Sequence, residues 1–375
     1  MIPTAIQLHE MYHYRKPTRL AIGVITPVSL ETQGGMQTSA MALINQLKKM
    51  GHAVVVYSAN KQSGDWNVFG GTGFIPKLNL DVIHVHHIAM SGRYTSLLKR
   101  RFPHTSVVTT VHGLFASDPE YCRLRWSVSE PARQLLRIVP GKYLEKKSIS
   151  KADYVITPSE RIYGICKRIN GKCQIIPNGI DMDMFTPQAS FRQGSQVHIL
   201  CPGRLFEERG QIYLIKALPE ILKSVDCHVT FMGGYDPAYL DQILTTANKL
   251  GVSKKITVRD SVPYTQTPLM YRLFDLIAFP ALMESFGMSI VENLALSNVV
   301  VASNVENIPN LIQHEENGLL VPPANPGELA RAVIRGLTDK PLINKIRSNA
   351  RNSVMKYDII TIAKQVDWIY HEVLP

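Results

Sequence analysis

The sequence has no long hydrophobic run and few cysteines. These two features argue against a membrane-spanning protein and against a disulfide-rich one. Apolar residues nowhere continue for the ~20 positions that span a bilayer. The N-terminal stretch mixes His, Arg and Lys with short apolar steps, which does not fit a signal peptide. The five cysteines are odd in number and lack CxxC spacing, so neither a disulfide framework nor a zinc site is indicated. We therefore expect a soluble, cytoplasmic protein.

Charge is distributed unevenly along the chain. The 41 Lys and Arg exceed the 30 Asp and Glu by 11, and residues 1–185 hold the whole excess, with 23 basic against 12 acidic side chains. The segments 93–101 and 123–151 interleave basic with apolar or aromatic residues, a pattern of an anionic-surface contact or of a solvated helix face. The charge pattern alone does not decide whether the protein contacts the inner face of a membrane. We expect no nucleic-acid partner, because no binding module accompanies the charge.

Alternating strand and helix patterns predict an α/β protein. The strand-like LAIGVIT at 20–26 leads through a glycine loop into a helix pattern that ends at Gly51, and VVVYS follows as the next strand. Similar short β-branched runs recur to Ile176, and the alternation starts again with VHILCPG at 197–203. Each half therefore predicts a parallel sheet covered on both faces.

The length and the restart of this pattern predict two domains. A single core rarely grows beyond about 250–300 residues, and this chain has 375. The polar segment from Asn178 reads as a linker that begins with a turn. We expect two Rossmann-like, doubly wound domains facing across a cleft, with an amphipathic C-terminal helix that can pack back on the first. The predicted boundaries are 1–188, 189–355 and 356–375.

The stretch 276–303, LIAFPALMESFGMSIVENLALSNVVVAS, carries the strongest chemical signal. A buried strand ends at Pro280, a short loop carries Glu284, and Gly287 opens a helix on which Glu292 lies early. A helix N-terminus attracts phosphate, and glycine there allows close approach. Acidic side chains nearby can accept hydrogen bonds from ribose or sugar hydroxyls. A solvated pair of acids at a helix cap is the simpler alternative.

These residues resemble the family-4 retaining glycosyltransferases of the GT-B fold, also described as glycosyl transferases group 1. The family signature is two glutamates separated by seven residues around a Phe-Gly step, here Glu284, Phe286, Gly287 and Glu292. The resemblance implies that Glu292 holds the ribose, Glu284 the donor sugar, and the backbone near Gly287 the diphosphate. It extends the substrate-binding set to Ser285 and Met288.

A second motif, CPGRLFEERGQ at 201–211, carries Gly203, Arg204 and Arg209. Two fixed cations can stabilise a departing diphosphate without a metal. The pair is similar to the phosphate-binding Arg and Lys of the family, with Arg209 in the Lys position. A guanidinium is a planar fork rather than a point donor, so the geometry differs. Surface ion pairs are the alternative role for these arginines.

The N-terminal half carries weaker candidates. The Gly34-Gly35 loop resembles the family's glycine loop near acceptor and donor phosphate, although such glycines often serve backbone geometry alone. His112, at a strand end, corresponds to a family histidine close to the reacting sugar and is the fourth catalytic candidate beside Glu284, Arg204 and Arg209. A structural hydrogen-bonding role is its alternative.

Three neighbouring histidines raise the question of a metal site. His84, His86 and His87 lie on one predicted strand, where adjacent side chains point to opposite faces, and no carboxylate partner is nearby. We therefore expect neither a metal nor a cofactor.

The resemblance implies a retaining, metal-independent hexosyltransferase that uses a nucleotide diphosphate sugar, with UDP or GDP as carrier, and a saccharide or lipid-linked hydroxyl as acceptor. The chain departs from the family's Gly-Gly-Ile-Pro-Glu, since residues 306–310 read Glu-Asn-Ile-Pro-Asn. Donor identity is therefore left open. The alternatives are a nucleotide-sugar epimerase and a non-catalytic nucleotide-sugar-binding scaffold at a membrane surface. A dinucleotide dehydrogenase is disfavoured, because no GxGxxG follows either first strand.

Overall fold

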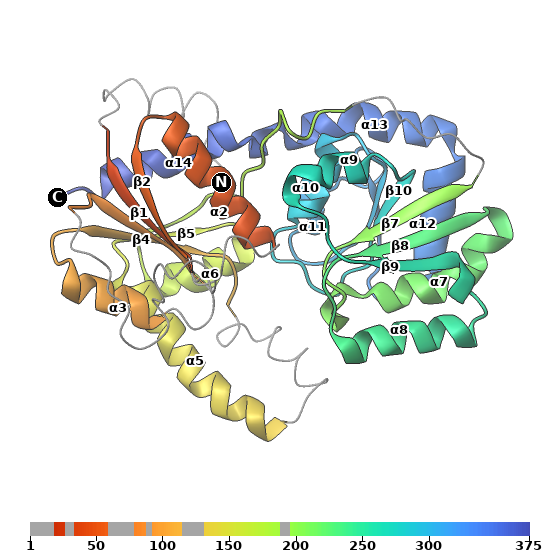
Figure 1. Ribbon diagram of the computed structural model, residues 1–375, viewed down its shortest axis with the longest axis horizontal. Helices are drawn as coiled ribbons and strands as arrows, with labels where there is room; N and C mark the ends of the chain where they lie inside the picture. The colour runs from red at the N-terminus through yellow and green to blue at the C-terminus, as the bar shows by residue number, and fades with distance from the viewer. Residues whose placement is uncertain (1–18, 27–33, 59–78, 88–91, 115–130, 188–195) are drawn as a thin grey trace. The chain divides into compact units, whose positions relative to one another are not determined.

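The computed structural model describes residues 19–26, 34–58, 79–87, 92–114, 131–187 and 196–375. The chain divides into two compact units (Figure 1). The N-terminal unit comprises residues 1–179 together with 359–375, and the C-terminal unit comprises residues 180–358.

The N-terminal unit is built on a parallel sheet with the strand order β2-β1-β3-β4-β5-β6. The strands are β1 (Ala21–Thr26), β2 (Ala53–Ser58), β3 (Val82–His87), β4 (Ser106–Val111), β5 (Tyr154–Thr157) and β6 (Cys173–Ile175). The order reverses between β1 and β3. In open sheets of this kind, ligands bind beyond the carboxyl ends of the strands at such a reversal.

Helices cover both faces of this sheet. They are α2 (Gly35–Lys49), α3 (Gly92–Arg101), α5 (Pro131–Lys151), α6 (Glu160–Ile169) and α14 (Ile359–Glu372). Alternation along β1 sends Ile22 to the face covered by α2 and α14, and Ile25 to the face covered by α3. Figure 1 shows α14, the end of the chain, running beside α2.

Polar contacts as well as apolar packing hold α14 in the N-terminal unit. Ile369 and Tyr370 are fully buried. The Tyr370 hydroxyl lies 2.6 Å from His84 Nδ1, and His84 Nε2 lies 2.7 Å from Thr110 Oγ1. Burial lowers the pKa of His84 well below its ordinary value, with His86 and His112 adding to the effect, so the imidazole is neutral at pH 7.

Replacing Tyr370 by Phe should therefore destabilise the N-terminal unit by about 1–3 kcal/mol, because His84 loses a hydrogen-bond partner in a buried site. Urea denaturation followed by circular dichroism measures the change. Tyr143→Phe is the matched control, since Tyr143 is 64% exposed. An equal effect of both substitutions would contradict the proposed contribution of the buried contact.

The C-terminal unit contains a second parallel sheet, with the order β12-β11-β10-β7-β8-β9. Its strands are β7 (Val197–Pro202), β8 (Cys227–Met232), β9 (Ile256–Arg259), β10 (Leu276–Phe279), β11 (Val300–Ser303) and β12 (Leu319–Val321). Numbered within the unit, this is the 3-2-1-4-5-6 order of the Rossmann fold. The reversal lies between β7 and β10, whose following loops carry the two motifs of the sequence.

Two hydrophobic clusters fill the C-terminal unit, one on each face of its sheet. The helices are η1 (Glu207–Arg209), α7 (Gln211–Ser224), α8 (Pro237–Lys249), η2 (Ser253–Lys255), η3 (Tyr264–Gln266), α9 (Thr267–Tyr271), α10 (Met288–Ala295), α11 (Ile308–Leu311), α12 (Pro326–Thr338), α13 (Lys340–Val354) and η4 (Met355–Tyr357). Side chains of α7, α8 and α12 belong to one cluster, and side chains of α9, α10 and α11 to the other.

The segment predicted as a polar linker is partly core. Met182 and Phe185 are 4% and 0% exposed and pack in the second cluster, so the units divide at Gly179–Ile180, before the predicted position 188. The Ile180 N–H donates to the Tyr357 carbonyl, so the end of η4 meets the start of the unit. Asn178 stays in the N-terminal unit, where its side chain accepts a hydrogen bond from Ser39 Oγ.

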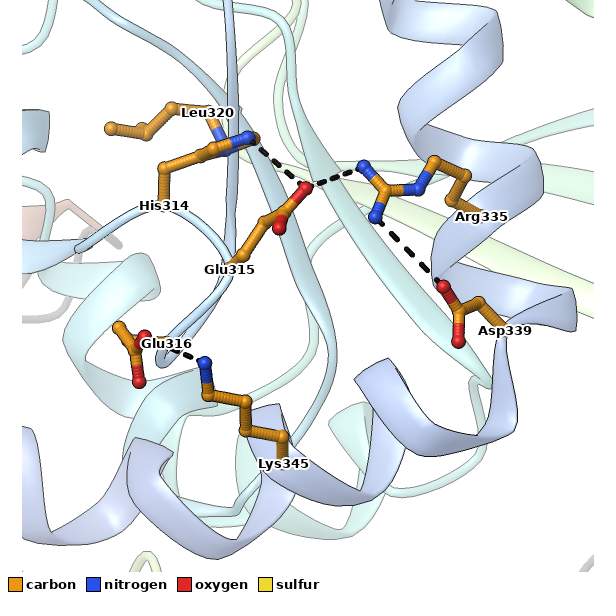
Figure 2. Close-up of polar contacts among 7 residues, drawn as sticks. All are labelled: His314, Glu315, Glu316, Leu320, Arg335, Asp339 and Lys345. Carbon is orange, nitrogen blue, oxygen red and sulfur yellow. Dashed lines mark hydrogen bonds and ion pairs between the residues drawn. The ribbon is translucent and has the colours of Figure 1, made fainter.

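Exposed ion pairs surround the turn before β12 (Figure 2). Arg335 Nη1 lies 2.6 Å from Glu315 Oε1, and Lys345 Nζ lies 2.6 Å from Glu316 Oε1. The hydrogen bond from Arg335 holds the pKa of the Glu315 carboxyl below its ordinary value. All four side chains are at least 41% exposed, so each pair contributes at most about 1 kcal/mol. Loss of the Arg335 side chain is therefore expected to change stability little.

Some sequence predictions fall outside the described residues. The basic segment 123–151 is described only from residue 131, and residues 1–18 and Cys122 are not described. Within the described part, the other four cysteines are buried thiols. No helix in that part is both long enough and apolar enough to cross a membrane.

Candidate active site

The loop after β7 begins with a glycine that brings two strand ends into contact. Gly203 has φ +115°, and its N–H donates to the Met232 carbonyl at 2.9 Å. A Cβ on Gly233 would lie 2.4 Å from the Gly203 carbonyl oxygen. Arg204 follows on the exposed side, with its guanidinium 5.0 Å from the centre of the Phe206 ring. The tight backbone thus presents Arg204 at the carboxyl end of β7.

Gly210 joins this loop to the loop after β10. It has φ +65° at the N-cap of α7, and a Cβ there would lie 2.0 Å from the Pro280 carbonyl oxygen. The N–H groups of Leu282 and Met283 both donate to the Glu208 carbonyl, at 2.9 and 3.1 Å. The two sequence motifs therefore meet at the reversal point of the C-terminal sheet.

An ion pair between side chains also connects the two motifs. The Arg209 guanidinium contacts the Glu284 carboxylate, and these side chains are 30% and 14% exposed. The family resemblance implies that Arg209 binds the diphosphate and Glu284 the sugar. In the structure they contact one another, so each positions the other, and the pair has no net charge. Arg204 carries a further positive charge on the same loop as Arg209.

The glutamate loop leads into α10 through a left-handed glycine. Gly287 has φ +95° and is the N-cap of the helix. A Cβ there would lie 2.8 Å from Leu311 Cδ1 and 3.6 Å from Glu284 Cγ. The first N–H groups of an α-helix have no partner within the helix, and the helix dipole makes this end positive. The start of α10 therefore suits an anionic group of a ligand.

The other residues of the predicted set around Gly287 separate into buried and exposed. Phe286 and Met288 are 3% and 7% exposed, so their side chains belong to the core and do not contact a ligand from solvent. The Phe286 ring packs edge-on against Tyr357, with centroids 5.7 Å apart. Ser285 is exposed between Glu284 and Phe286.

Glu292 lies in an apolar part of the unit. Its side chain is 3% exposed, and its carboxyl accepts a hydrogen bond from the Tyr271 hydroxyl at 3.3 Å. Burial raises its pKa to about 7, and the nearby hydroxyls of Tyr264 and Tyr271 partly offset this rise. Glu292, the residue predicted to bind the ribose, is therefore a buried acid next to two tyrosines. Sequence reasoning missed both tyrosines, because they lie in η3 and α9, 28 and 21 residues before Glu292.

The loop after β11 supports the glutamate loop. The Glu284 N–H donates to Glu306 Oε2 at 2.7 Å, and Asn307 Nδ2 donates to the Phe286 carbonyl at 2.8 Å. Sequence reasoning assigned these residues no role. The signal was present in the departure from Gly-Gly-Ile-Pro-Glu at residues 306–310.

The glycine candidates of the N-terminal unit lie at its own sheet reversal. Gly34 precedes α2 and Gly35 is its first residue, after the described end of β1 at Thr26. The Gly34 carbonyl accepts a hydrogen bond from the Thr38 N–H. Residues 27–33 lie outside the described part of the chain. The glycine pair thus begins a helix at the position where this sheet type binds ligands.

The histidine candidate belongs to a stack of imidazoles. His112 Nε2 lies 2.9 Å from His86 Nδ1, and the ring of His86 stacks on the ring of His84 at 4.5 Å between centroids. Burial lowers the pKa of His86 to about 4, so it is neutral at pH 7. Within the described residues, no three His, Cys, Asp or Glu side chains form a potential metal site.

Comparison with known proteins assigns the fold. Over 94% of the chain it matches the structure of sucrose-phosphate synthase from Thermosynechococcus elongatus, with a TM-score of 0.80, 22% identity and 99% of that chain covered. The HepE protein of Anabaena in complex with UDP-glucose matches with a TM-score of 0.73 and 18% identity, covering 94% and 99% of the two chains. The predicted fold class is confirmed, since the fold is that of the GT-B glycosyltransferases.

Sequence comparison assigns the family. Residues 185–353 match the profile of glycosyl transferases group 1, and residues 65–184 match that of glycosyltransferase family 4. An uncharacterized glycosyltransferase of Methanocaldococcus jannaschii is 31% identical over 285 residues, which are 69% of this chain and 72% of that protein. The chain belongs to the group 1 glycosyltransferases.

Proposed function

We propose that this protein transfers a sugar, with retention of anomeric configuration, from a nucleotide diphosphate sugar to a hydroxyl of a saccharide or lipid-linked acceptor. The observation that carries the proposal is the meeting of the two motifs at the reversal point of the C-terminal sheet. Arg204 and Arg209 belong to the loop after β7, and Glu284 and Gly287 to the loop after β10. The Arg209–Glu284 contact and the backbone hydrogen bonds to Glu208 join these two loops.

The positive groups suit the leaving group of this reaction. As the bond between the anomeric carbon and the diphosphate oxygen breaks, its electron pair goes to the diphosphate. Arg204, Arg209 and the N-terminus of α10 would stabilise that charge. Arg204 and the helix N-terminus supply positive charge, and Arg209 supplies N–H donors while it is paired with Glu284. These groups can take the place of a metal ion, so we propose that transfer needs no metal. Activity should therefore persist in EDTA.

The acids suit the sugar side of the donor. Glu284 would accept hydrogen bonds from sugar hydroxyls, because a carboxylate has acceptor capacity beyond its ion pair with Arg209. Glu292 would serve the ribose if the Tyr264 and Tyr271 hydroxyls leave one of its oxygens available. The acceptor oxygen would attack the anomeric carbon on the face that the diphosphate leaves, with its proton passing to the departing phosphate oxygen. No protein nucleophile is then needed. By the family resemblance, His112 would lie close to the reacting sugar.

A donor panel followed by an acceptor assay tests the proposal. A ligand at 100 times its dissociation constant adds ~2.7 kcal/mol of stability, so thermal shifts with UDP, GDP, ADP and dTDP sugars would identify the carrier. The selected donor is then incubated with saccharide and lipid-linked acceptors, and NMR reads the product anomer. Product formed without an acceptor would indicate an epimerase. Carrier binding with no turnover on any acceptor would indicate a scaffold, and a product of inverted configuration would contradict retention.

A further inference from the structure

Glu306 has a backbone conformation that glutamate rarely adopts. Its φ is +44°, in the left-handed region, where a residue with a Cβ is strained by about 1–2 kcal/mol relative to the right-handed region. Glycine adopts this conformation without that strain. Strained residues persist where the surrounding structure holds them, and they gather at functional sites. The side chain of Glu306 is therefore expected to have a use that offsets the strain.

The side chain of Glu306 holds the backbone of Glu284. Glu306 Oε2 accepts the Glu284 N–H at 2.7 Å, a charge-assisted hydrogen bond. The carboxylate of Glu284 is in turn held by Arg209. Glu284 is thus fixed at both ends, at its amide by the loop that follows β11 and at its carboxylate by η1.

The neighbouring residue holds the same loop at a second point. Asn307 is buried, and its Nδ2 donates to the Phe286 carbonyl at 2.8 Å. Asn307 Oδ1 accepts a hydrogen bond from Asn310 Nδ2 at 3.1 Å, which fixes the orientation of the amide. Asn307 therefore secures the approach to α10 without Glu306. Glu306 holds the same loop at Glu284.

We propose that Glu306 is a positioning residue that sets the Glu284 carboxylate for the donor sugar. The inference rests on the proposed function, in which Glu284 binds that sugar. Loss of the Glu306 carboxylate frees the Glu284 amide and lets its side chain drift from the productive position. The diphosphate contacts of Arg204 and the start of α10 do not pass through Glu306. The loss should therefore affect the sugar and spare the nucleotide.

Three variants separate this role from a structural one. Glu306→Gly removes the carboxylate and relieves the backbone strain, whereas Glu306→Gln keeps an oxygen that can accept the Glu284 N–H. Glu315→Gly is the matched control, because Glu315 also has a positive φ, +63°, and lies in the exposed turn before β12. Three quantities are measured: donor kcat/KM, the dissociation constant of the free nucleoside diphosphate, and the urea midpoint of unfolding. The nucleoside diphosphate is the one that the thermal-shift panel of donors identifies.

Glu306→Gly should lower donor kcat/KM about tenfold or more, while the affinity for the free nucleoside diphosphate changes less than about twofold. Its unfolding midpoint should equal or exceed that of the wild type. Glu306→Gln should stay within about threefold of wild-type kcat/KM, and Glu315→Gly should match the wild type.

Two results would overturn the inference and leave the proposed function intact. One is an unchanged kcat/KM in Glu306→Gly, and the other is a parallel loss of nucleoside diphosphate binding, which would indicate a general collapse of the loop. A wild-type protein that binds the nucleotide sugar without transferring it would contradict the proposed function, and the inference would fall with it.

Discussion

Replacing Arg204 by Ala should lower turnover by about 100- to 1,000-fold, the loss found when one fixed donor to a developing anion is removed. Arg204 follows β7 at the sheet reversal and is exposed, with its guanidinium resting over Phe206. The diphosphate is already anionic in the donor and gains a further negative charge as the glycosidic bond breaks, so the loss should fall on kcat more than on donor KM. Steady-state kinetics with the selected donor measures both constants.

The control for this experiment is Arg335→Ala. Arg335 belongs to the same unit and pairs with Glu315 in the exposed turn (Figure 2). Its loss should leave kcat unchanged and cost at most about 1 kcal/mol of stability. Urea midpoints establish whether each variant is folded. Near-normal turnover of a folded Arg204→Ala enzyme would remove Arg204 from the proposed site.

Raising the pH should destabilise the wild-type C-terminal unit relative to a Glu292→Gln variant by up to roughly 3 kcal/mol. Burial raises the pKa of Glu292 from its ordinary value of 4.5 to about 7 in the folded protein. Below pH 4.5 the carboxyl is protonated in both the folded and the unfolded state, so it does not reduce the free energy of unfolding. Between pH 4.5 and 7 the unfolded chain ionises first, so the wild type loses stability as the pH rises, and the loss is complete above pH 7.

Urea unfolding of both proteins at about pH 5 and about pH 8 measures this effect. The neutral amide of the variant does not titrate, so the stability difference between variant and wild type should increase with pH. The Tyr271 hydroxyl can still donate to the amide oxygen of the variant, as it does to Glu292. A difference that is the same at both pH values would show that Glu292 titrates normally and is not buried as described.

The sheet architecture could be predicted from the sequence because its signals are local. Runs such as LAIGVIT and LIAFPA are apolar and β-branched, and each is a strand within one or two residues of its predicted bounds. Glycines at 51 and 287 mark helix ends through positive φ angles. These features depend on neighbours in the chain, and a pattern of residue types captures them.

The details of the site depend on contacts between distant residues, which the sequence pattern does not encode. Arg209 and Glu284 are 75 positions apart, and their pairing follows from the contact of the Gly210 backbone with Pro280. The resemblance identified both residues but not their contact. Likewise, Glu292 was predicted at a ligand, and its burial beside Tyr271 depends on the packing of α9 against α10.

The segment after Asn178 illustrates a second kind of contact that composition does not encode. The segment after Asn178 is polar overall, so it reads as a linker, but Met182 and Phe185 are buried. Arg351 anchors this segment, donating to the carbonyls of Met182, Phe185 and Ala295. A few well-placed side chains therefore bring a polar stretch into the core, and composition averages over them.

A crystal structure with the selected nucleoside diphosphate tests the central claim most directly, because it locates the pyrophosphate. We predict phosphate oxygens within hydrogen-bond distance of the Arg204 guanidinium and of backbone N–H groups at the start of α10, next to Gly287. A nucleotide bound elsewhere, or a pyrophosphate beyond the reach of both groups, would contradict the account.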